Sequence, residues 1–121
     1  MKILIVDDSE LARALLRRTL EENVKADALE LVEATNGDEA MKALGTKDVS
    51  LVFLDWNMPV VDGLSFVRQA RADGVRIPII MITAVSDEAK IYEACQAGVT
   101  DYIEKPIRGP ELWARIEGYV R

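Results

Sequence analysis

The sequence predicts a doubly wound α/β domain, in which a five-stranded parallel sheet is covered by helices on both faces. Two observations predict this fold class. Short apolar runs alternate five times with helical patterns, and the strongest runs show no polar–apolar alternation. A strand without such alternation is typical of a sheet covered on both faces, and strands that alternate with helices join in parallel through right-handed crossovers. A length of 121 residues gives room for one domain, so residues 1–121 are expected to form one.

Five apolar runs are the candidate strands. Residues 3–6, 51–54 and 79–82 are the strongest candidates, because each run is wholly apolar and is bounded by polar or turn residues. Residues 29–32 and 102–103 are weaker candidates. The expected order along the chain is therefore a strand followed by a helix, repeated five times.

Sets of apolar residues spaced by three or four predict the helices, since that spacing lines one buried face. The sets are Leu11, Leu15, Leu16 and Leu20; Ala40, Met41 and Leu44; Phe66, Val67 and Ala70; Ile91, Ala94 and Cys95; and Leu112, Ile116, Tyr119 and Val120. Boundary residues support them, because Asn36-Gly37 precedes the second set, Gly98 follows the fourth and Pro110 stands near the start of the fifth. Cys95 is expected to be a small core residue.

Composition excludes several function classes. The chain has no histidine, which excludes Ser-His-Asp and Cys-His catalysis, histidine metal ligands and a phosphohistidine of its own. A formal net charge of −6 argues against direct binding to nucleic acid or to anionic lipid. The chain has one cysteine, no signal-peptide pattern and no apolar stretch near the roughly 20 residues of a membrane span. We therefore expect a cytoplasmic protein without membrane insertion.

Polar residues stand at the carboxyl ends of four predicted strands. Asp7 and Asp8 end the first strand, Asp55 the third and Thr83 the fourth, and Lys105 follows the fifth almost at once. In a parallel sheet these ends share one edge, where ligands bind near the switch in strand order. Three carboxylates, a hydroxyl and an ammonium are therefore expected to meet there.

Carboxylates crowded in this way repel one another, and Mg²⁺ is the cation that we expect to hold them ionised. Mg²⁺ takes oxygen ligands and typically shares its coordination shell with a phosphate. Asp55 is the candidate nucleophile, because a carboxylate can form an acyl phosphate and this one stands between two acids and Lys105. The pattern thus indicates phosphoryl transfer onto an aspartate.

Each of these residues also has a simpler interpretation. Asp8 or Ser9 can cap the first helix, Thr83 alone is an ordinary strand-end hydroxyl, and Lys105 alone is a surface charge. Asp55 is harder to explain in this way, because the segment that it begins cannot continue as a helix past the proline at position 59. The coincidence of all these groups at one edge favours a site.

Four segments together resemble the receiver domain of bacterial response regulators, in particular the single-domain chemotaxis (CheY-like) type. They are Ile-Val-Asp-Asp-Ser at 5–9, Asp-Trp-Asn-Met-Pro at 55–59 with Asp62-Gly63, Thr83-Ala84, and Tyr-Ile-Glu-Lys-Pro at 102–106. The resemblance spans essentially the whole chain. It implies a flavodoxin-like (βα)5 fold with strand order 2-1-3-4-5. It also implies a signalling protein rather than an enzyme, which catalyses only its own phosphotransfer and autodephosphorylation.

The resemblance implies that Asp55 accepts a phosphoryl group from the phosphohistidine of a sensor histidine kinase or of a phosphotransfer protein. It assigns Mg²⁺ to the side chains of Asp8 and Asp55 and to the backbone carbonyl of Asn57. Asp7 is expected to help mainly through water. Lys105 is expected to pair with the phosphoryl group.

The resemblance also assigns a switch to Thr83 and Tyr102. Thr83 is expected to bond the phosphoryl oxygens and Tyr102 to fill the space that this movement opens. The face made by the fourth helix, fifth strand and fifth helix would then repack for a downstream target protein. The Lys105-Pro106 peptide is expected to be cis. Ile107 stands where an aromatic residue is frequent in the family, and Val85 occupies a position that influences how fast water reaches the acyl phosphate.

Three other functions fit the sequence less well. A phosphatase of the haloacid dehalogenase type needs two acids separated by one residue, whereas Asp7 and Asp8 are adjacent. A flavodoxin-like cofactor binder needs a phosphate loop after the first strand, where these two acids would repel phosphate. A docking scaffold that takes no phosphate is disfavoured by the retention of all five site residues. The chain is either a single-domain protein or a receiver domain excised from a longer response regulator with an output domain.

Overall fold

The computed structural model describes residues 1–46 and 48–120 and contains one five-stranded sheet. Its strands are β1 (Lys2–Val6), β2 (Glu30–Ala34), β3 (Val49–Leu54), β4 (Ile79–Thr83) and β5 (Asp101–Glu104). They are all parallel and lie in the order β2-β1-β3-β4-β5. This arrangement confirms the predicted fold class and strand order.

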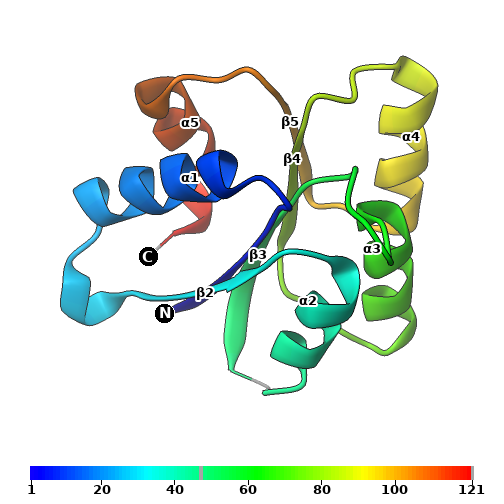
Figure 1. Ribbon diagram of the computed structural model, residues 1–121, viewed down its shortest axis with the longest axis horizontal. Helices are drawn as coiled ribbons and strands as arrows, with labels where there is room; N and C mark the ends of the chain where they lie inside the picture. The colour runs from blue at the N-terminus through cyan, green and yellow to red at the C-terminus, as the bar shows by residue number, and fades with distance from the viewer. Residues whose placement is uncertain (47, 121) are drawn as a thin grey trace.

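Helices cover both faces of the sheet (Figure 1). They are α1 (Glu10–Asn23), α2 (Gly37–Leu44), α3 (Gly63–Ala72), α4 (Glu88–Ala97) and α5 (Gly109–Ile116), with short 3₁₀ turns at Ala26–Ala28 and Glu117–Tyr119. Helices α1 and α5 lie on one side of the sheet, and α2, α3 and α4 lie on the other. In the part of the chain that the structure describes, no helix is both long and apolar enough to cross a membrane.

The predicted helix boundary signals are confirmed. Asn36 caps α2, where its side chain accepts a hydrogen bond from the Glu39 amide, and Gly98 ends α4 in the left-handed conformation at a φ of 114°. Pro110 stands in the first turn of α5. Each residue therefore performs the role that its chemistry favours, which explains why these three helix ends were readable from the sequence.

The side chains of the strands contribute to two separate apolar layers, one on each face of the sheet. On β1, Ile3 and Ile5 belong to the layer beneath α1 and α5, whereas Leu4 and Val6 belong to the layer beneath α2, α3 and α4. All four are at most 1% exposed. Because successive side chains of a strand point to opposite faces, a continuous apolar run is what a doubly covered strand needs.

The two weaker strands are longer than predicted. Strand β2 covers Glu30–Ala34 rather than 29–32, because it pairs with β1 from Lys2↔Glu30 to Val6↔Ala34 and so extends as far as its partner does. Strand β5 likewise covers Asp101–Glu104 rather than 102–103, in register with β4. Both are edge strands, where polar residues are tolerated and an apolar run is a weak guide to the boundary.

The buried face of α1 differs from the prediction. Leu16 and Leu20 are buried, but Leu11 is 82% exposed and Leu15 is 40% exposed. At 3.6 residues per turn, Leu11 lies roughly 140° around the helix from Leu16. The four leucines therefore do not share one face, and the prediction was wrong for Leu11 and Leu15.

One prediction about a core residue, Cys95, and one about the extent of the fifth helix were also wrong. Cys95 is exposed, because α4 directs its neighbour Ala94 into the core and consecutive helical residues point in different directions. Helix α5 ends at Ile116, so Tyr119 lies in the following 3₁₀ turn and is half-buried. Val120 is buried, as expected, although it lies beyond the helix.

Candidate functional site

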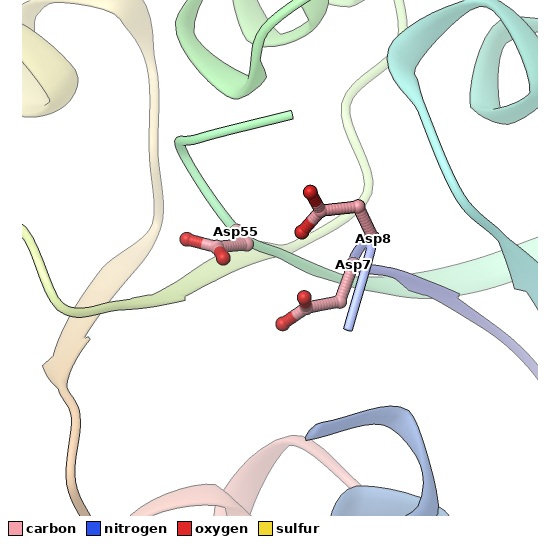
Figure 2. Close-up of side chains that lie close together, drawn as sticks. All are labelled: Asp7, Asp8 and Asp55. Atoms are coloured by element: carbon pink, nitrogen blue, oxygen red, sulfur yellow. The ribbon is translucent and has the colours of Figure 1, made fainter. Parts of the chain in front are cut away.

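Three carboxylates meet at the carboxyl edge of the sheet. Oxygen atoms of Asp7, Asp8 and Asp55 all lie within 4.8 Å of one another, and Figure 2 shows the side chains facing a common space. Parallel pairing explains this, because Val6 of β1 is level with Leu54 of β3 and the Asp55 amide donates to the Val6 carbonyl at 3.0 Å. The residues that follow the two strands are therefore held side by side.

Asp7 is buried and fully engaged. One carboxylate oxygen, Oδ1, accepts a hydrogen bond from the Ser9 amide at 2.9 Å, and the other, Oδ2, pairs with the Lys105 ammonium at 2.7 Å. Burial of a carboxylate is tolerated when it is paired and hydrogen-bonded in this way. Asp7 is thus held in a fixed orientation next to the other two acids.

Asp55 has one oxygen that lacks a partner. Its side chain is only 12% exposed, and Oδ2 lies 3.5 Å from the Lys105 ammonium. Among the described residues, Asp55 Oδ1 is the buried side-chain oxygen or nitrogen that has no hydrogen-bond partner. Such an oxygen is costly to bury and points to a ligand. An unpartnered carboxylate oxygen among three acids fits a hard divalent cation such as Mg²⁺, which prefers oxygen donors.

Asp8 is exposed and is not the cap of α1. The cap is Ser9, whose hydroxyl accepts a hydrogen bond from the Ala12 amide at 3.2 Å. The simpler interpretation therefore holds for Ser9 and not for Asp8. The carboxylate of Asp8 is directed towards the other two acids, as a metal ligand at the mouth of the site would be.

Lys105 is the cation of the site. Its amide donates to the carbonyl of Thr83 at 2.8 Å, which places it at the same edge of the sheet, and its side chain is 25% exposed. Burial by itself lowers the pKa of Lys105, but the hydrogen bond with Asp7 and the charges of Asp55 and Asp7 outweigh it and raise the pKa above the ordinary value. Lys105 is therefore a permanent positive charge at neutral pH. Its peptide bond to Pro106 is cis, as the resemblance implied.

Thr83 and Tyr102 both contact the backbone of Val85. The buried Thr83 hydroxyl accepts a hydrogen bond from the Val85 amide at 3.4 Å, and the Tyr102 phenol donates to the Val85 carbonyl. Burial raises the pKa of Tyr102 to about 12, and the negative charges of Glu104 and Asp55 add to the effect. The segment after β4 is therefore held from both sides. No motif in the sequence signals the contact between Tyr102 and Val85.

The segment that follows Asp55 is closely packed. Trp56 is buried, with the Lys90 ammonium of α4 lying 5.3 Å from its ring centroid, whereas Asn57 is exposed. The Gly63 amide donates to the Trp56 carbonyl at 2.8 Å, and a Cβ atom at Gly63 would lie 2.3 Å from the Asp55 carbonyl oxygen. A glycine is required here by the close approach of two backbone segments.

A cavity of about 610 Å³ opens beside the acids, between α1 and the segment that joins β5 to α5. Its lining is mainly apolar and includes Leu11, Leu15 and Ile107, and it reaches Asp55 and Lys105. The exposed leucines of α1 therefore stand at the entrance to the site. The sequence contained this signal, but the helical spacing was interpreted as a wholly buried face.

The sequence interpretation also missed Arg13. This residue of α1 donates a hydrogen bond from its guanidinium to the main-chain carbonyl of Asp7 at 2.6 Å. A single arginine on a helix carries no recognisable motif, so this contact becomes visible only in three dimensions.

Comparison with known proteins gives one consistent result. Residues 3–117 match the family model described as the response regulator receiver domain. The chain is 40% identical over 120 residues to the chemotaxis protein CheY1 of Helicobacter pylori strain J99, which covers 97% of this chain and 94% of the relative. It is 38% identical to the CheY homolog of Campylobacter jejuni strain 81-176, over 97% of this chain and 90% of the relative. The receiver domain of the Francisella response regulator 1452 superposes with a TM-score of 0.86 at 27% identity, covering 98% of this chain and 94% of that one.

Proposed function

The chain belongs to the response regulator receiver domain family, and on that basis we propose that it accepts a phosphoryl group on Asp55. The observation that carries the proposal is the unpartnered, buried Oδ1 of Asp55, which stands among three carboxylates and beside the Lys105 ammonium. The Asp55 carboxylate has two oxygens, so one can bind the cation while the other attacks, and the Lys105 ammonium beside Oδ2 supplies charge compensation.

The transfer follows from the groups present. A carboxylate oxygen of Asp55 attacks the phosphorus of a phosphohistidine, an oxygen–phosphorus bond forms, and the phosphorus–nitrogen bond breaks with its electron pair returning to the imidazole. The Lys105 ammonium stabilises negative charge on the transferring oxygens. Asp8, Asp55 and the backbone carbonyl of Asn57 would hold Mg²⁺, with Asp7 acting mainly through water, and the bound cation would offset the charge of the acids and the phosphoryl group. Water later hydrolyses the acyl phosphate.

The phosphoryl donor is a sensor histidine kinase or a phosphotransfer protein. In this proposal its histidine approaches Asp55 beside α1, where the cavity reaches the acids, and its surface covers Leu11 and Leu15. Leu11 is 82% exposed, and an apolar side chain at that position supports contact with an apolar helix face of the donor. The position of the cavity and of these leucines therefore supports an approach of the donor from the side of α1.

The output is a change in the face made by α4, β5 and α5. In the proposed switch, phosphorylation adds about −1.5 to −2 charge to the site. The Thr83 hydroxyl then leaves the Val85 amide and hydrogen-bonds a phosphoryl oxygen. Movement of Val85 then alters the hydrogen bond from Tyr102, which lies on β5. A downstream target protein reads the repacked face.

The proposal treats residues 1–121 as one receiver domain that works in the cytoplasm. Kinship with the CheY1 and CheY homolog proteins favours a chemotaxis-type relay. In that setting the only catalysis by the chain is its own phosphotransfer and dephosphorylation.

Intact-mass spectrometry tests the proposal. The purified chain is incubated with a small acyl-phosphate donor, with MgCl₂ or with a chelator, and compared with the variant Asp55→Asn. We expect the wild-type protein to gain the mass of one phosphoryl group only with MgCl₂, and the variant to gain none. A wild-type mass that does not change, or an equal gain in the variant, would contradict the proposed role of Asp55.

A further inference from the structure

A guanidinium ties the backbone of the acid pair to the neighbouring strand. Arg13 Nη1 donates to the carbonyl of Asp7 at 2.6 Å, and Arg13 Nε donates to the carboxylate of Glu33 on β2 at 2.9 Å. The Arg13 side chain is only 13% exposed. A planar guanidinium that is nearly buried and bonded at two places has one orientation, so it transmits a fixed position from β2 to Asp7.

Strand β2 also holds the preceding peptide unit, which joins Val6 to Asp7. The Asp7 amide donates to the carbonyl of Ala34 at 3.1 Å, so the amide and the carbonyl of Asp7 are both tied to consecutive residues of β2, directly or through Arg13. The Asp7 carbonyl belongs to the peptide that continues into Asp8. The orientation of that peptide therefore sets the position of the Asp8 backbone, from which the side chain extends.

Asp8 depends on this support more than its neighbours do. Asp7 is buried and is held by Ser9 and Lys105, whereas the Asp8 side chain is exposed and is not fixed by core packing. Its carboxylate nevertheless lies within 4.8 Å of the other two acids. The backbone at Asp7 and Asp8 is what keeps it there.

We propose that Arg13, held by Glu33, is a positioning residue that sets the Asp7–Asp8 peptide and so brings the Asp8 carboxylate into the Mg²⁺ site. The inference rests on the proposed function, because it assumes that the three acids bind Mg²⁺. Partners that orient metal ligands without touching the metal typically change metal affinity by 10–100-fold. Arg13 has that relation to Asp8.

The sign of the effect separates positioning from simple electrostatics. A positive charge near a cation site weakens cation binding, so its removal alone would make Mg²⁺ bind more tightly. Loss of positioning does the opposite. Arg13→Gln removes the charge, and Arg13→Lys keeps the charge but loses the planar two-site contact. Positioning therefore predicts weaker binding in both variants, and electrostatics predicts tighter binding in Arg13→Gln.

The experiment is a titration with MgCl₂ followed by the emission of Trp56, in a Trp113→Phe background so that a single tryptophan reports. We expect the Mg²⁺ dissociation constant to rise roughly tenfold in Arg13→Gln and in Arg13→Lys. Amide hydrogen exchange at Ser9, whose amide donates to Asp7 Oδ1, should be faster in both variants when it is measured by NMR without Mg²⁺. This second readout does not depend on the metal.

Arg17→Gln is the matched control. Arg17 pairs with the other carboxylate oxygen of Glu33, so it contacts Glu33 and not the Asp7 carbonyl. We expect the Mg²⁺ dissociation constant of this variant to stay within about twofold of the wild-type value, because an exposed ion pair contributes little energy. Equal or tighter binding in Arg13→Gln, or an equal loss in Arg17→Gln, overturns the positioning role. A wild-type protein with no saturable response to MgCl₂ overturns the proposed function instead.

Discussion

Single residues at the site show two unfavourable features, an unpartnered buried oxygen and crowded carboxylates. Asp55 leaves a buried oxygen unpartnered, and three acids lie within 4.8 Å of one another. Lys105 offsets part of this charge, and burial keeps its partner Asp7 in place. Such an arrangement is expected at a functional site, because a group that reacts or binds a ligand keeps an atom free of partners within the protein.

Tyr102 gives a pH-dependent prediction at this scale. Its pKa is about 12 in the folded protein, against 10.0 for an ordinary tyrosine, so the folded state keeps the phenol proton where the unfolded state has lost it. The contribution of Tyr102 to stability is therefore complete below pH 10 and is lost as the pH rises from 10 towards 12. Urea unfolding of the wild-type protein and of Tyr102→Phe, on both sides of pH 10, measures it.

The wild-type free energy of unfolding should fall more steeply than that of Tyr102→Phe above pH 10. Below that pH the variant should be less stable by about 1 kcal/mol, because the hydrogen bond to Val85 is lost. Parallel curves for the two proteins at alkaline pH would show that the phenol is not held as the structure has it.

At the scale of secondary-structure elements, the site depends on how α3 begins. Asp62 caps α3 through a 2.8 Å hydrogen bond from the Ser65 amide, and Gly63 lies against the backbone of Asp55 and Trp56. The start of this helix therefore packs directly against the backbone of Asp55 and Trp56. A change in the helix at Gly63 is expected to move Asp55.

Gly63→Ala tests this dependence. The added Cβ atom would lie 2.3 Å from the Asp55 carbonyl oxygen, so the backbone must shift, and we expect a loss of about 1–3 kcal/mol in stability together with slower phosphorylation. The matched control is Gly118→Ala, where nothing lies within 4 Å of the added atom. Urea unfolding and the rate of phosphorylation by a small donor measure the two effects. Equal behaviour of the two variants would show that the contact at Gly63 does not constrain Asp55.

Helix α1 provides a second prediction at this scale. Leu11→Glu places a charge on the proposed contact with the donor, so transfer from a phosphorylated phosphotransfer protein should slow by at least roughly tenfold. Transfer from a small acyl-phosphate donor should not change, since that molecule needs no protein surface. Tyr92→Glu is the control, because Tyr92 is also an exposed apolar residue but lies on α4. Slowing with both donors would mean that the Leu11 change damages the site itself.

The elements show why part of this structure was predictable. The three central strands were found because doubly covered strands are wholly apolar, and helix ends were found because Asn36, Gly98 and Pro110 act through local chemistry. The buried face of α1 was predicted wrongly, because Leu11 has an apolar side chain typical of a core residue but lies on the surface. Local patterns do not distinguish the two.

At the scale of the whole molecule, the order of parallel strands creates the site. Strands β1 and β3 are neighbours, so the acids that follow them converge, and this was predictable from the fold alone. The contacts of Arg13 with Asp7 and of Tyr102 with Val85 were not predictable, because each joins side chain to backbone across different elements. Such contacts depend on the positions of several elements at once, and no local pattern in the sequence records them.

Chemical trapping of the phosphorylated residue tests the central claim most directly. Borohydride reduces an aspartyl phosphate to the alcohol, which leaves homoserine at the modified position, and peptide sequencing by mass spectrometry locates it. After phosphorylation in MgCl₂, we predict homoserine in place of Asp55 and nowhere else. Homoserine in place of Asp7 or Asp8, or none in a protein that has gained phosphate, would contradict the assignment of Asp55 as the acceptor.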